Sequence, residues 1–510
     1  MANPLRIFQT ARRTAGLLVA VALVATLGGC ARPSSLQEIR DEGTLHVITR
    51  TAPSIYYQGR NGPTGYDYEL AKRLADSLGV HLRIREAEDN TEILSVLDNG
   101  YAHIGMAGLS DRPSFHDRFQ TLPTGIETQS VVVYRRGDER PDSLDDLAGQ
   151  TLHAVAGSDH KEVLSRLGAF DQGVTLASHP GLDPAGILDR VDKGDFKLAI
   201  VSSNELELNR VFFPKVNVAF TVGKPRPLVW LFPKDQDNTL ISAARALIDR
   251  MKARGELAQL SERFYGHLDQ LNYVGARTFM YHVENRLPQY EDLFKAQARD
   301  VNMDWRLLAA IGYQESHWRP NAKSPTGVRG LMMLTRTTAS SLGINDRLDV
   351  KESIEGGARY FQVVHDKIPE RIPEPDRTWF ALASYNVGFG HLEDARRLAE
   401  GAGKNPDRWI DVKEFLPLLS QKAWYSRTRF GYARGQEPVL YVQNIRRYYD
   451  VLARLRRPVQ PTPEEPTPRL AGDGEPPASE GTTTAETDNE VSTELRASLP
   501  PDLAVIPPTL

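Results

Sequence analysis

The chain has too little cysteine for disulfide bonds and too little excess charge to suggest a nucleic-acid partner. Cys30 is the only cysteine among 510 residues, so no disulfide can form within the chain. No group of Cys and His residues has metal-ligand spacing, and we expect neither a metal ion nor another cofactor. The net charge of −4 lacks the basic excess of proteins that bind nucleic acids, so we expect no such partner.

No apolar run is long enough to cross a membrane as a helix, but one has the length of a secretory signal. Residues 15–29 form this run of 15 residues, behind Arg12 and Arg13. A membrane-spanning helix needs about 20 apolar residues. A shorter run behind positive charges is typical of a signal peptide, which is therefore predicted over residues 1–29.

The end of the predicted signal peptide resembles a bacterial lipobox. It reads Leu27-Gly28-Gly29-Cys30, and Ala31 follows. The resemblance implies that Cys30 is acylated and becomes the first residue of the mature chain. An alanine after the cysteine resembles the sorting pattern of the outer membrane, so we expect the protein at its periplasmic face. The alternative is an ordinary signal peptide with a chance cysteine. Residues 30–42 are predicted to be a linker.

Residues 43–267 alternate short apolar runs with amphipathic stretches. Runs such as 45–48 and 82–84 predict strands, and stretches such as 68–78 and 239–254 predict helices. This alternation indicates an α/β domain with a mostly parallel sheet. Two sheets joined by strands near Val133 and Val229 would form two lobes with a cleft between them.

The character of the chain changes after this domain. Helix-period segments dominate residues 268–457, which predicts a mainly α domain. Residues 458–510 contain eleven prolines, ten acidic residues, two basic residues and no aromatic residue. Such a segment buries too little apolar surface to offset its chain entropy, so we predict a disordered acidic tail.

The segment from Trp305 to Ser316 places a carboxylate among apolar residues. Glu315 lies four residues after Ile311 and seven after Leu308, so it falls on the apolar stripe of the predicted helix. Burial raises the pKa of a carboxyl group, and a carboxylic acid that is protonated near neutrality is suited to general-acid cleavage of a glycosidic bond. The alternatives are that Glu315 caps the helix end or pairs with an arginine.

Four motifs in order surround this helix. They are Glu-Ser at 315–316, Gly-x-x-Gly-Leu-Met at 327–332, Ala-x-Tyr-Asn-x-Gly at 383–388 and Glu-x-x-x-Tyr-Val at 437–442. Together they resemble the soluble lytic transglycosylase domain. The resemblance implies a lysozyme-like α fold that cleaves peptidoglycan glycan strands between N-acetylmuramic acid and N-acetylglucosamine without water, leaving a 1,6-anhydro end. The alternative for Gly327 and Gly330 is that they are plain turn glycines.

The resemblance implies a mechanism with one carboxyl group. Glu315 matches the single catalytic acid and base, Ser316 matches a serine that hydrogen-bonds near it, and Tyr441 matches a tyrosine that faces it. Retaining glycosidases usually place a second carboxylate about 5 Å away, which this family lacks. The N-acetyl group of the substrate assists instead, and the C6 hydroxyl attacks C1 after Glu315 deprotonates it.

Further residues match substrate contacts of the family. Tyr385 and Asn386 match cleft residues that touch the glycan. Ser316, Met333 and Tyr441 are expected to bind the substrate as well, although Met333 stands where many relatives have glutamine. The alternative for Tyr385 and Tyr441 is that both are core aromatics with a satisfied hydroxyl.

Residues 43–266 resemble the family 3 extracellular solute-binding proteins. The resemblance lies in the segments 62–71, 105–112 and 157–159. It implies that Arg112 clamps a ligand carboxylate and that the amides near Ser158 hold an anion. Serines occupy 202 and 203, where the family places an acidic residue, which favours a peptide ligand or none over a free amino acid. The alternative for Arg112 is a surface salt bridge.

The predicted fold is therefore multidomain: an α/β two-lobed, periplasmic-binding-protein-like domain followed by a mainly α, lysozyme-like domain. The leading interpretation is a cell-wall lyase with a ligand-sensing domain. Its partners would be peptidoglycan strands, a muropeptide or amino-acid ligand, and the outer membrane. A second interpretation is a solute- or muropeptide-binding protein whose helical domain only grips glycan. A third is a muramidase that uses water, whose products would be one water heavier.

Overall fold

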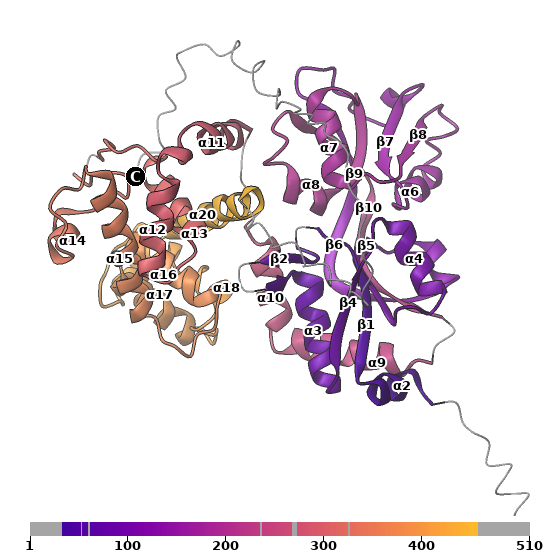
Figure 1. The fold of residues 1–510 in the computed structure, drawn as a ribbon, viewed down its shortest axis with the longest axis horizontal. Helices are drawn as coiled ribbons and strands as arrows, with labels where there is room; N and C mark the ends of the chain where they lie inside the picture. Colours follow the sequence, from indigo (N-terminus) through magenta and orange to yellow (C-terminus); the bar gives the residue numbers. More distant parts are fainter. Residues whose placement is uncertain are drawn as a thin grey trace, which may run out of the picture.

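A computed structural model describes most of the two predicted domains (Figure 1). The described residues are 33–52, 54–59, 62–234, 237–267, 273–324 and 327–456. The predicted signal peptide, Cys30 and the whole acidic tail lie outside them. Within these ranges, no helix combines the length and the apolar character needed to cross a membrane.

The first lobe is built on three parallel strands in the order β4-β1-β5. They are β1 (Thr44–Thr49), β4 (His81–Glu86) and β5 (Ile104–Ser110). Because parallel strands need crossover connections, helices cover both faces of this part of the sheet. Helices α3 (Tyr66–Leu78) and α9 (Thr239–Ala253) share one core, and α4 (Asn90–Asp98) packs into another.

The two lobes share one eight-stranded sheet, whereas the sequence suggested two sheets. Strands β6 (Phe119–Arg135) and β10 (Val216–Pro233) run through both lobes. They pair with each other antiparallel along nearly their whole length, with register shifts between Val222 and Arg226. The runs predicted near Val133 and Val229 are parts of these long strands, so hydrogen bonding continues across the junction of the lobes.

The second lobe repeats the α/β pattern. Its strands are β7 (Thr151–Val155), β8 (Thr175–His179) and β9 (Leu198–Ser202), and its helices are α6 (His160–Arg166), α7 (Pro184–Lys193) and α8 (Ser203–Asn209). The first domain also contains a hairpin, β2 (Tyr57–Gly59) with β3 (Gly62–Thr64), a short helix α5 (Pro113–His116) and the closing helix α10 (Glu256–Tyr265).

Most of the predicted linker is part of the first domain. Residues 35–42 form helix α2 (Ser35–Glu42), whose N-terminus is capped by the Ser34 hydroxyl. Ile39 is fully buried in the core of the first lobe, and the Ser35 hydroxyl donates to Asp237 at 2.7 Å. Ile39 and the partly buried Leu36 dock this segment on the core, and a composition-based linker prediction overlooks them.

The second domain is helical, as predicted. Its longer helices are α11 (Tyr273–Asn285), α12 (Glu291–Asp300), α13 (Trp305–Ser316), α15 (Val350–Lys367), α16 (Asp376–Val387), α17 (Phe389–Gly401) and α20 (Gln436–Leu455). Its shorter ones are α14 (Arg336–Ser341), α18 (Trp409–Val412) and α19 (Lys422–Tyr425). Helix α20 packs against α13 and α16, and the core of the domain lies between them.

Helix α20 also joins the helical domain to both lobes of the first domain, toward which it extends in Figure 1. The buried guanidinium of Arg446 donates to the Glu262 carboxylate at 2.9 Å, and Lys413 donates to the same carboxylate at 2.7 Å. Two turns further along, Arg454 donates to Asn209 of α8 at 2.6 Å. The helix that carries Tyr441 is therefore anchored on the first lobe through α10 and on the second lobe through α8.

Candidate active site

Helix α13 presents Glu315 in its last turn. Asp304 caps the start of the helix by accepting from the Arg306 backbone N–H at 3.0 Å. His317 caps the end of the helix with a left-handed φ of 52°, and Trp318 follows with a φ of 54°. Two successive non-glycine residues in this conformation cost free energy and end the helix after Ser316, one residue beyond Glu315. Neighbouring hydrogen bonds hold this turn, including one from the Trp318 indole to the Ala309 carbonyl at 2.8 Å.

The Glu315 carboxyl is half-buried and faces helix α20. It accepts a hydrogen bond from the Tyr441 hydroxyl at 2.5 Å. Burial raises the pKa of Glu315 to about 7, and the bond from Tyr441 acts in the opposite direction. Among the described residues, no lysine, arginine or histidine forms an ion pair with this carboxyl, and burial and the Tyr441 hydroxyl alone shift its pKa, which removes the arginine-pair alternative. Glu315 can therefore hold or release a proton near neutral pH.

Aromatic rings line the neighbourhood of this carboxyl. The rings of Tyr385 and Tyr441 are stacked, with centroids 6.3 Å apart, and Tyr360 lies 4.9 Å from Tyr385. Tyr441 is 4% exposed, yet its hydroxyl bonds the predicted catalytic group, so it does more than fill the core. Tyr385 and Asn386, at the end of α16, are half-buried and close enough to the surface for a ligand to reach.

Ser316 takes a different place from that expected, whereas the position of Met333 leaves its expected role as a prediction. Ser316 is 3% exposed, and its hydroxyl donates to the Leu331 carbonyl at 2.7 Å and accepts from the Arg319 N–H at 3.0 Å. Because these bonds tie α13 to the loop that follows, the structure gives Ser316 a positioning role and not a substrate contact. Met333 is half-buried at the end of that loop, with a left-handed φ of 49°.

Gly327 and Gly330, the two glycines of the loop, differ in the space that a side chain would have at each position. Both have positive φ angles, 84° for Gly327 and 90° for Gly330. A Cβ at Gly330 would lie 1.8 Å from the carbonyl oxygen of Arg347, whereas one at Gly327 would meet nothing within 4 Å. Gly330 is therefore required by close backbone packing behind the active-site loop, and only Gly327 fits the description of a plain turn glycine.

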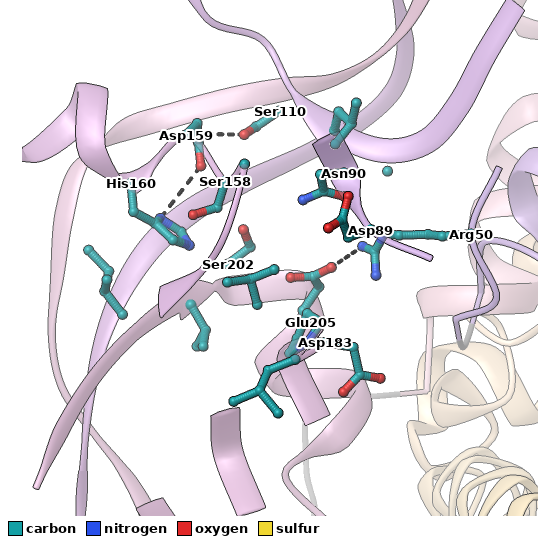
Figure 2. Close-up of a pocket in the computed structure, with 18 of the residues that line it drawn as sticks. Arg50, Asp89, Asn90, Ser110, Ser158, Asp159, His160, Asp183, Ser202 and Glu205 are labelled. Carbon is teal, nitrogen blue, oxygen red and sulfur yellow. Dashed lines mark hydrogen bonds and ion pairs between the residues drawn. The ribbon is translucent and has the colours of Figure 1, made fainter. Parts of the chain in front are cut away.

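The cleft between the two lobes of the first domain is a second candidate site (Figure 2). Arg112 projects from the first lobe and donates to the backbone carbonyls of Gly157 at 3.2 Å and Ser158 at 3.0 Å in the second lobe. The two residues predicted to bind a ligand thus contact each other across the cleft. The remaining cavity measures about 50 Å³, too small for an amino acid without movement of the lobes.

The cleft contains acidic residues that the sequence did not reveal. Figure 2 shows Glu205 paired with Arg50 across the lobes, and Ser110 donates to Asp159 at 2.5 Å. Glu205 stands on α8, just beyond the serines at 202 and 203 that seemed to leave the site without an acid. The expected strand position is polar and uncharged, and the carboxylate comes from the first turn of the following helix.

Comparison with known proteins places both domains in families. Residues 292–407 match the Transglycosylase SLT domain, and residues 44–267 match the bacterial extracellular solute-binding proteins, family 3. The fold and the site thus define a transglycosylase of the SLT class joined to a solute-binding domain. Both resemblances noted in the sequence are confirmed, and the enzyme interpretation is favoured over that of a binding protein.

Close relatives match this chain along most of their own length. A membrane-bound lytic murein transglycosylase F of Marinobacter nauticus is 61% identical over 505 residues, which cover 99% of this chain and 100% of the relative. Proteins of the same name from Pseudomonas syringae pv. syringae and Hahella chejuensis are 47% and 46% identical, covering 88% and 97% of this chain and 90% and 95% of their own. The chain belongs to the membrane-bound lytic murein transglycosylase F family.

Proposed function

We propose that this chain is a lytic transglycosylase that cleaves the peptidoglycan strand between N-acetylmuramic acid and N-acetylglucosamine, with Glu315 as its catalytic acid and base. One observation carries the assignment of the residue: a half-buried carboxyl, with its pKa raised to about 7, lies 2.5 Å from the Tyr441 hydroxyl in a domain of this family. A domain that only gripped glycan would gain nothing from a proton-transferring group held in this state.

One carboxyl suffices for the reaction. Protonated Glu315 gives its proton to the oxygen that leaves C1, and the N-acetyl oxygen of the muramic acid stabilises C1 as an oxazolinium ion. The carboxylate then takes the proton of the C6 hydroxyl, whose oxygen attacks C1 within the same sugar ring. This attack is intramolecular, so it competes effectively with water. Glu315 ends protonated, and no water is consumed. Product mass separates this reaction from hydrolysis, because the anhydro end lacks one water.

The pH dependence of the rate should report Glu315. The first step needs the protonated carboxyl, so the rate should fall as the pH rises through about 7. Tyr441→Phe removes a hydrogen bond that lowers the pKa of Glu315. In this variant, we therefore expect the rate to fall at a higher pH than in the wild type and the maximal rate to drop about tenfold. Tyr448→Phe is the matched control: it lies two turns along α20 and packs against Tyr313, and its profile should match the wild type. If the rate of Tyr441→Phe fell at the same pH as that of the wild type, the assignment of Glu315 as the catalytic group would be wrong.

We propose that the first domain binds a small zwitterionic peptide from the cell wall. Carboxylates outnumber arginines in the lining of the cleft, which suits a ligand with an amino group as well as a carboxylate. The lobes must separate to admit it, and α20 connects both lobes to Tyr441. Stem-peptide fragments should therefore change the lyase rate by roughly 5–150-fold, the range of allosteric coupling. Arg112→Ala should abolish the response; calorimetry without peptide binding would contradict the proposal.

We further propose that a lipid on Cys30 holds the protein at the outer membrane. The names of the relatives describe membrane-bound proteins, and the sequence around Cys30 resembles a lipobox. Cys30→Ala should move the protein from the membrane fraction to the soluble periplasmic fraction. Firm membrane attachment of this variant would show that another surface anchors the chain.

A further inference from the structure

The helical domain has a second pocket beside the turn that follows the catalytic helix. It measures about 220 Å³ and lies between the first helices of the domain and residues 318–320. Arg286 and Arg319 both line it, and Tyr281 and Tyr290 add aromatic surface. Tyr281 is 49% exposed, so the pocket is open to solvent. Nothing in the reaction described above uses these residues.

The two arginines of the pocket carry positive charge and have no carboxylate partner in direct contact. Within the described part of the chain, neither Arg286 nor Arg319 forms an ion pair, and the hydrogen bonds of both side chains go to backbone carbonyls. His282 and His317 lie beside them, and burial together with the two guanidinium groups lowers the pKa of each histidine to about 4. Both imidazoles are therefore neutral at physiological pH, and the two arginines remain as the fixed charges of the site.

Both guanidinium groups are held in place by the turn after Glu315. Arg286 donates to the His317 carbonyl at 2.6 Å, and the Nε of Arg319 donates to the Ser316 carbonyl at 3.0 Å. A guanidinium has five N–H donors, so these bonds orient each group and leave further donors for a ligand. The arrangement is fixed before binding, which reduces the entropy lost when a ligand arrives.

We propose that this pocket binds a carboxylate of the peptide chains attached to the peptidoglycan strand. The proposal rests on the function proposed above. Guanidinium groups match carboxylates in shape as well as charge, and the aromatic walls suit the carbon chain that carries the carboxylate. Arg319 follows Glu315 by four residues, so their backbones are at most about 15 Å apart. A strand that is cut at Glu315 can therefore reach the pocket with a peptide of the same substrate.

A substitution that adds one negative charge at the rim of the pocket tests whether the pocket binds a carboxylate of the substrate peptide. Gln289 lines the pocket and is exposed, and Gln289→Glu leaves both arginines and their backbone contacts in place. The matched control is Gln362→Glu, an exposed glutamine on α15 outside the pocket. The full chain is assayed on two substrates, strands that carry peptides and strands from which an amidase has removed them. The quantity compared is the ratio of kcat/KM for the two substrates.

The ratio should fall about tenfold or more in Gln289→Glu, the scale of a hydrogen bond to a charged group, and keep its wild-type value in Gln362→Glu. An unchanged ratio in a folded Gln289→Glu variant would overturn the proposal, and so would an equal loss on both substrates. Binding to vesicles that contain phosphatidylglycerol is measured in parallel. Loss of vesicle binding with an unchanged ratio would assign the pocket to a lipid phosphate and also overturn it. If the wild type cleaved neither substrate, the proposed function itself would fail.

Discussion

Glu315→Gln should abolish formation of 1,6-anhydro products while the protein stays folded. The amide has nearly the size of the carboxyl group but no proton to transfer, so both steps assigned to Glu315 are lost. General acid–base groups contribute about 10²–10⁴-fold each, and we expect at least this loss in turnover. Mass analysis of products from purified peptidoglycan measures it, because it separates anhydro ends from hydrolysed ones.

For stability, the expected effect of Glu315→Gln is the opposite of its effect on turnover: the variant should lose nothing at alkaline pH. The pKa of Glu315 is raised in the folded state, so the folded protein binds the proton more tightly than the unfolded chain does. The contribution of the Glu315 carboxyl to the free energy of unfolding is therefore complete at low pH, and it is lost as the pH rises through about 7. A neutral glutamine has no such dependence. At pH 8 the variant should therefore be at least as stable as the wild type, since Tyr441 can still donate to the amide oxygen.

A matched substitution distinguishes the loss of proton transfer from a general effect of replacing a carboxylate by an amide. Glu400→Gln changes an exposed carboxylate at the end of α17 and should leave turnover and stability unchanged. Near-normal turnover in Glu315→Gln would refute the assignment of the catalytic residue. A variant that lost activity and was clearly less stable at pH 8 would instead show that Glu315 supports the fold.

The catalytic helix could be predicted from the sequence because its signal is local. Apolar residues at helical spacing place Leu308, Ile311 and Glu315 on one side, and the structure has a helix there from Trp305 to Ser316. The partner of Glu315 was available only through the family motif. Tyr441 lies 126 residues away, and no periodicity indicates which tyrosine approaches a given carboxyl. The family resemblance predicted this long-range contact, which the apolar periodicity of single segments could not predict.

Other features depended on three-dimensional context and were missed. Ser316 has the residue type of a ligand contact, but only the fold shows that its hydroxyl is used by the Leu331 carbonyl. Glu205 was overlooked because the carboxylate in the cleft comes from a helix and not from the strand position that the family uses. The linker prediction failed at Ile39, a single buried residue in a polar segment. In each case, the deciding neighbour is distant in the sequence.

Helix α20 connects three functional regions of the chain. Tyr441 bonds Glu315, Arg446 bonds Glu262 of the first lobe, and Arg454 bonds Asn209 of the second lobe. Asn209 in turn lies on α8, the helix whose first turn supplies Glu205 to the cleft. Separation of the lobes must therefore either move α20 or break one of these contacts. This continuous path of packed elements gives the proposed peptide response a physical route to the catalytic carboxyl.

Gly330→Ala should be among the most destabilising single substitutions in the helical domain. The added Cβ would lie 1.8 Å from the Arg347 carbonyl oxygen and 2.9 Å from the Ser353 hydroxyl, at a φ of 90° that alanine disfavours. The first neighbour is backbone, so the loop itself must move. We expect the free energy of unfolding to fall by about 3 kcal/mol or more, from overpacking and backbone strain together.

Gly327→Ala provides the comparison within the same loop. Its φ of 84° is also left-handed, but no atom lies within 4 Å of the added Cβ, so only the backbone term of about 1 kcal/mol applies. Urea unfolding followed by tryptophan fluorescence reads out the difference, because five of the six tryptophans lie in the helical domain. Movement of residue 330 would also displace Leu331, whose carbonyl holds Ser316 next to the catalytic carboxyl. Gly330→Ala should therefore lose activity even at temperatures where it stays folded, and equal stability of the two variants would contradict the close packing assigned to Gly330.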